Sequence, residues 1–544
     1  MTRRLCLVLA LVLAGLPFHA QEAGLPNAVR TAADSITAEQ LARDLAYLAS
    51  DELQGRNTPS PGFDKAADYI VKRLEQAGVK PAGDRGTFLQ TYVMRESQVT
   101  TDETYVEFEA QKFKFGDHFV LRSFAAPLAG HRPVVYVGHG WTIPAQGIDP
   151  YAGIDVRGKF LLVHGPRALP KGVALRQLGR VTVGANSPLE EADRRGAAGV
   201  IFLSPAGAPD DWAGMRTQNT VRRELEPRVP SAYAAPAVTS ILLARKVAEG
   251  LLAGEQIEGA ALLERGDRQD YPSSFVLGKT VALHVPATHV DHRPYNVVAM
   301  LEGSDPVLKD EYLTIESHLD GAVGSRAVNG DSIYNSADDN ATGSAGTLAI
   351  AEVLARAPRP KRSLIFIWDS GEERGLWGTR HFVQVPPVPL EKIVAHINVD
   401  MIGANRAPGS ADAEAKAATG PNEVHVIGPR VLSPTAAALL DRVNRAYLHM
   451  RLNDDLDRVE NEFFYPRTDA GPFLERGILT IGFTTGMHAR YHGPADEASY
   501  LDPKKMEAIT RTVLASAWML ADAPDRPRIE SPMPETVPDY GRKK

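Results

Sequence analysis

The chain has 544 residues, of which 23% are charged and 44% are hydrophobic, and this length and composition predict a globular protein of two or three domains. Its formal charge of −7 at neutral pH, with no basic run, argues against nucleic acid or an anionic membrane surface as a partner. The composition does not indicate an oligomeric state.

Residues 1–20 predict an export signal. A pair of arginines precedes the apolar stretch 5–16, and cleavage is expected after residue 20, although Phe18 is bulky for its position before the cut. The stretch is too short for a comfortable bilayer span, so no stable membrane span is expected, with a retained anchor as the alternative. Cys6 is the only cysteine, so the mature chain would contain no disulfide. The sequence therefore predicts a periplasmic or extracellular protein.

Two amphipathic helices are predicted in residues 21–125, the first part of a domain that is split in sequence. Thr37 and Gln40 form a T-x-x-Q capping box at the start of the first helix. The second helix is expected over residues 63–77, with Gly78 as its C-terminal stop. The polar loop between them has the composition of a connector.

Residues 126–283 differ in character and predict an inserted, β-rich domain. Short apolar runs at 134–137, 160–163 and 200–203 alternate with glycine and proline turns, which is typical of strands. This segment contains no cluster of potential metal ligands. The strand pattern of the first domain resumes after residue 283, so that domain is expected to be split in sequence.

Residues 284–523 predict the second part of the split domain, as an alternation of strands and helices. Brief apolar runs bounded by turn residues are typical of buried parallel strands, and we expect them at 296–301, 312–316, 364–368, 393–399 and 478–483. A helix is expected at 341–357. The pattern predicts an α/β domain whose mixed, mostly parallel central sheet has helices on both faces. Residues 524–544, rich in proline and charge, predict a disordered tail.

Histidine and acidic residues follow these strands, at the sheet edge where ligands gather in open α/β folds. The candidates are His318, Asp320, Asp339, Glu372, Glu373, Asp400 and, further along, His492. Imidazole with several carboxylates and no thiolate suits zinc in a hydrolytic site, with manganese or cobalt as alternatives. Two ions bridged by one carboxylate need about five protein ligands and a free carboxylate as general base, and this set supplies them.

Each candidate alone also has a simpler interpretation. Residues 338–340 precede a helix, where aspartate and asparagine are common N-caps. Glu372 and Glu373 precede another helix, whose dipole favours acidic residues. His488 competes with His492 for the role of distant ligand. Only the conjunction of the clusters favours a metal centre.

The ordered motifs SHLD, ADDNATG, SGEERG, NVDMIG and YHGPADE resemble those of the secreted bacterial dizinc aminopeptidases. These enzymes belong to the metallopeptidase family that also contains glutamate carboxypeptidase and transferrin receptor. LASDELQGRNTPSPGFDKAADYI is similar to the N-terminal signature of that family, and YAGIDVRGKFLLVHG with ADRRGAAGVIFL resembles the protease-associated domain often inserted in it. The resemblance covers most of the mature chain.

The resemblance implies a zinc-exopeptidase fold and a role for each candidate. His318 and Asp400 would bind one zinc, Glu373 and His492 the second, and Asp339 would bridge the two. Glu372 would be the general base that removes a proton from the metal-bridged water. Asp320 would orient His318. The peptide bond after Asp339 is a candidate for the cis form. The implied activity is release of the N-terminal residue from peptides that have a free N-terminus.

Two alternatives to an aminopeptidase stay open. A carboxypeptidase of the same family would use the same zinc centre, although the large helical extension of glutamate carboxypeptidase is missing here. A catalytically silent, receptor-like protein would keep the fold without the activity. The run TDAGPF at residues 468–473 departs from the commoner serine-aspartate-histidine run, a difference that concerns the substrate pocket more than the metal centre. Trp377, Phe483 and Tyr491 are candidates to line that pocket, with a core role equally open.

Overall fold

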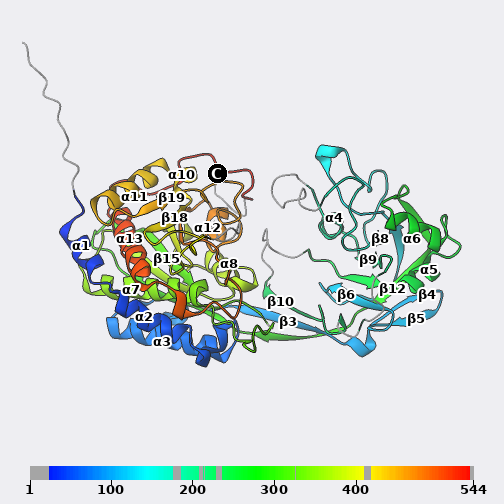
Figure 1. Cartoon of the computed structure of the whole chain (residues 1–544), viewed down its shortest axis with the longest axis horizontal. Coiled ribbons are helices and arrows are strands. Elements are labelled where there is room, and N and C mark those ends of the chain that lie inside the picture. Colours follow the sequence, from blue (N-terminus) through cyan, green and yellow to red (C-terminus); the bar gives the residue numbers. More distant parts are fainter. Residues whose placement is uncertain are drawn as a thin grey trace, which may run out of the picture.

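The structure, a computed structural model, describes residues 24–174, 185–207, 212, 215–227, 236–324, 326–409 and 418–538. The expected export signal, which includes Cys6, lies outside these ranges. Figure 1 shows two lobes joined by a narrow bridge that contains β3 and β10. None of the helices in the described ranges combines the length and the apolar character that a membrane crossing requires.

The first lobe is built on a nine-stranded sheet that draws strands from both ends of the chain. In spatial order these are β1 (Lys80–Pro81), β14 (Tyr295–Leu301), β16 (Ser363–Asp369), β15 (Tyr312–His318), β17 (Ile393–Val399), β20 (Leu479–Thr484), β18 (Glu423–Ile427) and β19 (Arg451–Asn453), while β2 (Leu89–Thr91) also pairs with β14. The four central strands are parallel, and β14 and β18 run antiparallel to them. The prediction of a mixed, mostly parallel central sheet is therefore confirmed.

Helices cover both faces of this sheet. The larger core lies under α1 (Asn27–Asp34), α2 (Ala38–Leu48), α3 (Pro61–Ala77), α7 (Gly343–Arg356), α11 (Pro434–Ala446) and α13 (Pro503–Ala521). A smaller core on the opposite face includes Phe382 of α8 (Trp377–Gln384) and Phe473 of α12 (Ala470–Glu475).

Local sequence signals account for the ends of several helices. The Ser60 side chain accepts a hydrogen bond from the backbone N–H of Phe63 at the start of α3, and Gly78, with a φ of 75°, ends that helix. Thr37 accepts from the backbone N–H of Gln40 at the start of α2. The helix expected at 341–357 starts two residues later, because a wide π-helical turn, Ala337–Thr342, precedes α7.

The second lobe has an eight-stranded sheet with cores of its own. Its strands are, in spatial order, β5 (Gln111–Lys114), β4 (Tyr105–Phe108), β12 (Phe275–His284), β7 (His131–Tyr136), β8 (Phe160–His164), β9 (Gly199–Leu203), β11 (Ser240–Leu243) and β6 (Phe119–Ser123). Its helices are α4 (Pro188–Arg195), α5 (Arg245–Leu252) and α6 (Gly259–Asp267). This sheet starts at β4, before the inserted segment expected at 126–283, because β4 and β5 bury alternate side chains against it.

A three-stranded antiparallel sheet bridges the lobes: β10 (Val221–Glu226), β3 (Val93–Val99) and β13 (Ala287–His292). On the side of the first lobe, Met94 of β3 and Leu225 of β10 form a small apolar cluster with Tyr92 and with Trp377, the first residue of α8. The bridge therefore packs against a segment of the first lobe that follows directly after β16.

Residues 524–538, expected to belong to a disordered tail, lie against the first lobe. Val537 is buried, and the carboxylate of Glu530 accepts hydrogen bonds from Ser433 and from the backbone of Thr435. The charged and proline-rich composition concealed the few apolar side chains, Ile529, Met533 and Val537, that anchor the segment to the core.

Candidate metal centre

The predicted ligands converge at one edge of the central sheet, beyond the carboxyl ends of its parallel strands. His318 is the last residue of β15, and Asp400 directly follows β17. Asp339 lies in the π-helical turn before α7, and Glu373 lies in the short helix Glu372–Arg374 that follows β16. His492 comes from the loop after β20.

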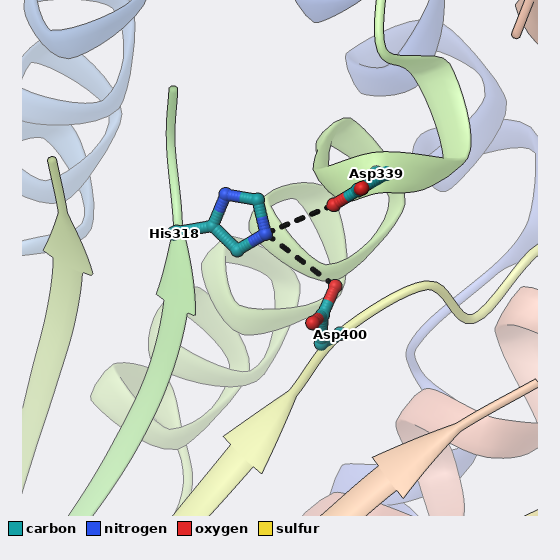
Figure 2. A group of neighbouring side chains, drawn as sticks. All are labelled: His318, Asp339 and Asp400. Carbon is teal, nitrogen blue, oxygen red and sulfur yellow. Dashed lines mark ion pairs between the residues drawn. The ribbon is translucent and has the colours of Figure 1, made fainter. Parts of the chain in front are cut away.

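These side chains form two groups that share Asp339. In the first, His318 Nε2 lies 3.0 Å from Asp339 Oδ1 and 3.5 Å from Asp400 Oδ1 (Figure 2). In the second, His492 Nε2 lies 3.0 Å from Asp339 Oδ2 and 3.1 Å from Glu373 Oε2. Because each group uses a different oxygen of Asp339, this carboxylate is placed to bridge two cations.

The donor atoms fit a metal ion better than they fit one another. His318 Nε2, Glu373 Oε1 and Asp400 Oδ1 are buried and have no hydrogen-bond partner. Buried polar atoms without a partner are costly, and an ion is one of the ordinary explanations for them. The ligand atoms of each group lie within 4.8 Å of one another. Nitrogen and oxygen donors in this arrangement suit zinc.

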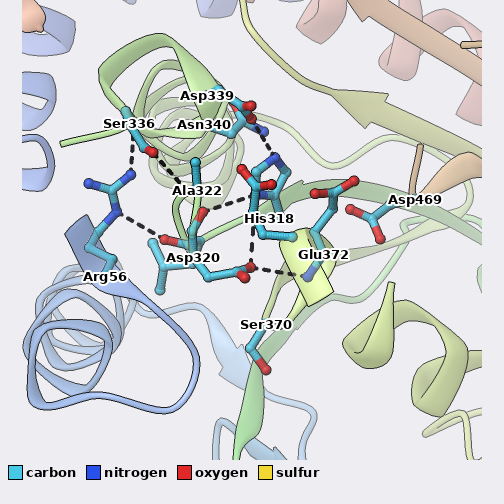
Figure 3. Close-up of polar contacts among 12 residues, drawn as sticks. Arg56, His318, Asp320, Ala322, Ser336, Asp339, Asn340, Ser370, Glu372 and Asp469 are labelled. Carbon is cyan, nitrogen blue, oxygen red and sulfur yellow. Dashed lines mark hydrogen bonds and ion pairs between the residues drawn. The ribbon is translucent and has the colours of Figure 1, made fainter. Parts of the chain in front are cut away.

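The tautomer of His318 also suits a ligand. Its Nδ1–H donates to the backbone carbonyl oxygen of Asp320 at 3.0 Å, so Nε2 carries the lone pair that faces Asp339 and Asp400 (Figure 3). The carboxylate of Asp320, expected to orient His318, is 3.8 Å from Nδ1 and accepts instead from the backbone N–H of Glu372 at 3.2 Å. Asp320 therefore positions both residues: its backbone carbonyl binds His318, and its side chain binds the backbone of Glu372.

Opposing charges shift the pKa values in the centre. Burial alone would lower the pKa of His492, but hydrogen bonds to Asp339 and Glu373 overcome this and raise it to about 10. Burial raises the pKa of Glu373 to about 7, with the charge of Asp339 adding to the effect. The centre therefore carries a strong negative potential, which a divalent cation would neutralise.

Glu372 belongs to neither ligand group. Burial, together with the charges of Glu373 and Asp469, raises the pKa of its carboxyl group well above the ordinary value. Figure 3 shows Glu372 beside His318, with Asp469 on its other side. A free carboxylate with a raised pKa beside a metal centre has the properties of a general base.

The structure also separates the two candidate histidines. His492 belongs to the second ligand group, whereas His488 Nε2 lies 3.3 Å from Asp338 Oδ2 and outside both groups. Asp338 and Asp339 each donate a backbone N–H to the carboxylate of Asp496, at 2.9 and 3.3 Å. Asp496 thus holds the turn that carries the bridging ligand, and its only signal in the sequence was its place in the YHGPADE motif.

Arg56 is a second positioning residue, and its only signal in the sequence was its place in the LASDELQGRNTPSPGFDKAADYI motif. Its guanidinium is fully buried and donates to the backbone carbonyls of Leu48, Leu319 and Asn335. It also donates to the backbone carbonyl of Ser336 (Figure 3). It lies in the polar loop that by composition was only a connector. This loop therefore joins the segment that follows His318 to the segment that precedes Asp339.

Of the three aromatic residues expected near a pocket, Tyr491 lies at the centre, and Phe483 lines a small cavity beside Asp400. Its ring stacks on His492 at 3.7 Å between centroids, and its hydroxyl accepts from Arg467 at 2.7 Å. Phe483 is buried in the core, and Trp377 packs against the bridge. The peptide bond between Asp339 and Asn340 is cis, as expected.

Known proteins are similar to this chain in sequence and in fold. Residues 296–517 match the model of Peptidase family M28. An aminopeptidase of Pseudomonas aeruginosa (strain UCBPP-PA14) is 26% identical over 472 residues, covering 85% of this chain and 72% of that protein. A probable zinc metalloprotease of Pyrenophora tritici-repentis is 27% identical over 268 residues, covering 42% of this chain and 58% of that protein. The structure of an aminopeptidase from Aneurinibacillus sp. strain AM-1 has 17% identity and a TM-score of 0.51, over 95% of this chain and all of that one, which shows a shared fold.

Proposed function

We propose that the protein is a dizinc aminopeptidase that releases the N-terminal residue of peptides, because residues 296–517 match the model of Peptidase family M28. The observation that carries this proposal is the pair of ligand groups that share Asp339. His318 and Asp400 would hold one zinc ion, and Glu373 and His492 the other. The Pseudomonas relative, an aminopeptidase, supports the choice of substrate end.

Two zinc ions bound there would polarise the scissile carbonyl and bring the pKa of a water molecule towards neutrality. The carboxylate of Glu372 removes a proton from the attacking water and delivers it to the leaving amine nitrogen. The Asp320 carboxylate holds the backbone N–H of Glu372, so the base and His318 keep a fixed relation to each other. The surplus of carboxylates suits a substrate ammonium group, which favours a free N-terminus.

Peptides blocked at one end test the proposal. We expect cleavage of a free peptide and of its C-terminal amide, and no cleavage of its N-acetyl form. Dialysis against a chelator should remove the activity, and zinc should restore it. Cleavage of the N-acetyl peptide but not of the amide would instead identify a carboxypeptidase. A purified protein with less than about one zinc ion per chain would point to a silent, receptor-like protein.

We further propose that the chain is exported and that the second lobe is a protease-associated domain. The charged and apolar pattern of residues 1–20 supports export, and the motifs in the second lobe support the domain type. Expression in a bacterial host, with fractionation and N-terminal sequencing, tests export. A mature protein that starts near residue 21 outside the cytoplasm is expected, and a full-length cytoplasmic protein would contradict it.

A further inference from the structure

A third group of carboxylates, Glu316, Asp369 and Asp469, lies close to the metal centre. It is on the face of the sheet that α8 and α12 cover. Glu316 precedes His318 by two residues on β15, so both side chains leave the same face of the sheet. Asp369 ends β16 opposite His318, and Asp469 precedes α12. All three are buried, with exposed fractions of 0%, 0% and 1%, and one oxygen of each lies within 4.8 Å of the others.

The three carboxylates have more oxygens than there are hydrogen-bond donors around them. Asn398 donates to Glu316 Oε2 at 2.9 Å, and Thr379 donates to Asp469 Oδ1 at 2.5 Å. The remaining four oxygens, Glu316 Oε1, both of Asp369 and Asp469 Oδ2, have no donor in the described parts of the chain. A single proton shared by Glu316 and Asp369 would satisfy only two of them, whereas one cation can be bound by all.

His396 supplies an independent indication of a missing ligand. It is fully buried on β17, its ring stacks on Phe473 at 3.8 Å between centroids, and its Nδ1 lies 2.8 Å from the hydroxyl of Thr314. Its Nε2 has no hydrogen-bond partner and faces the carboxylate group, 3.6 Å from Glu316 Oε2. Burial lowers the pKa of His396 to about 3, so the imidazole is neutral and does not balance the acidic charges.

No lysine or arginine in the described ranges forms an ion pair with Glu316, Asp369 or Asp469. Three buried carboxylates without a cationic partner are very costly when ionised. Such a group must take up either protons or a metal ion.

We propose that Glu316, Asp369 and Asp469 bind a third divalent cation, separate from the pair at Asp339. Carboxylate oxygens with no thiolate favour the hard ions Mg²⁺, Mn²⁺ and Ca²⁺ over zinc. The ion would join the ends of β15 and β16 to α12, and so would fix Asp469 beside Glu372. It is a structural ion with no part in the chemistry, so this proposal does not depend on the peptidase activity.

Metal analysis of the full-length protein tests this site with Mn²⁺ as the probe. Protein produced in medium with zinc and manganese should retain, after passage over a chelating resin, about one manganese ion per chain besides its zinc. The double variant Glu316→Gln, Asp369→Asn should lose manganese at least tenfold and keep its zinc. Asp400→Asn, at the first ligand group, should weaken zinc binding and leave manganese in place. Asp310→Asn, an exposed change on the same lobe, serves as the control.

A second measurement needs no variant. If the ion binds, refolding the zinc-loaded wild type with Mn²⁺ should raise its melting temperature by several degrees over refolding with zinc alone. Two results would overturn the proposal: manganese that enters only by displacing zinc, or wild-type protein that holds no third ion and melts at the same temperature with and without Mn²⁺. Either result would show that protons alone neutralise the three carboxylates.

Discussion

Glu372 and Glu373 are adjacent in the chain, yet they have different surroundings. Glu373 contacts His492 in the second ligand group, whereas Glu372 stays outside both groups with its backbone fixed by Asp320. We therefore expect Glu372→Gln to lower kcat by about 10²–10⁴-fold and to leave the zinc content unchanged, because only the proton acceptor is lost. Peptide hydrolysis assays together with metal analysis measure both effects.

Glu391→Gln, an exposed change in the same lobe, is the control for the loss of a glutamate charge. A Glu372→Gln enzyme with full turnover and full zinc content would remove this residue from the mechanism.

Asp496 acts on the centre through the backbone. Its two oxygens accept the N–H groups of Asp338 and Asp339, and Tyr500 donates to the same carboxylate at 2.9 Å. In Asp496→Asn an amide N–H₂ would face one of these backbone donors, so the turn that carries Asp339 would loosen. We expect zinc affinity to fall by about 10–100-fold, measured by competition with a chelator.

The exposed Asp525→Asn provides a matched control for this change. Unchanged zinc affinity in Asp496→Asn would mean that the turn keeps its shape without these hydrogen bonds.

The sequence indicated the candidate ligands and Asp320, but it did not single out Arg56 and Asp496 as residues that hold the segments around them. His318 and Asp400 lie at strand ends. A short apolar run followed by a histidine or an aspartate can be recognised in the sequence alone. Arg56 and Asp496 bind backbone groups 279 and 158 residues away in the sequence, and these partners are defined only once the chain has folded. Their residue types alone indicate an exposed loop as readily as a buried anchor.

At the scale of single elements, α4 in the second lobe depends on one buried carboxylate. Glu191 is fully buried and accepts hydrogen bonds from Arg194, Arg195, Thr142 and Asn186. Burial alone would raise its pKa, but these donors overcome burial and lower the pKa to about 2, from an ordinary value of 4.5. The lowered pKa means that folding favours the ionised form.

We therefore expect Glu191→Gln to destabilise the second lobe by roughly 2–3 kcal/mol at neutral pH, because charge-assisted hydrogen bonds are lost. The contribution of ionised Glu191 is complete above pH 4.5 and disappears as the pH falls through about 2. The stability gap between wild type and variant should shrink across that window in urea unfolding curves. Glu264→Gln, on the exposed side of α6, should show no such gap at any pH.

Helices and strands were predicted correctly where a single local sequence signal defines them. Apolar runs bounded by turns predicted the parallel strands, and Gly78 predicted the end of α3. The π-helical turn before α7 was not predicted, because its shape follows from hydrogen bonds of residues 338–340 to Asp496 and to the backbone carbonyl of Val399 at the end of β17. The start of the second sheet at β4 was missed because short, half-exposed strands carry little apolar signal.

At the scale of the whole molecule, the two lobes have separate cores and communicate through the bridge. Leu225 and Met94 of the bridge pack on Trp377, next to the helix that carries Glu372 and Glu373. We expect differential scanning calorimetry to resolve two transitions, one per lobe.

In Leu225→Ala the cavity should cost about 2–5 kcal/mol, and the two transitions should move further apart as the coupling weakens. Val221→Ala lies on the same strand at a more exposed position and provides the control. A single transition that shifts as a whole in both variants would show that the lobes unfold as one unit.

The pairing of β2 with β14 has a practical consequence. Thr91 and Tyr295 are register partners on neighbouring antiparallel strands, so the chain leaves the first lobe and returns to it at almost the same place. Residues 92–294 are thus an insertion between two paired strands, and a short hairpin turn could replace them. A shortened protein of this kind would be a minimal peptidase scaffold, and the same junction could accept a foreign binding module in place of the natural lobe.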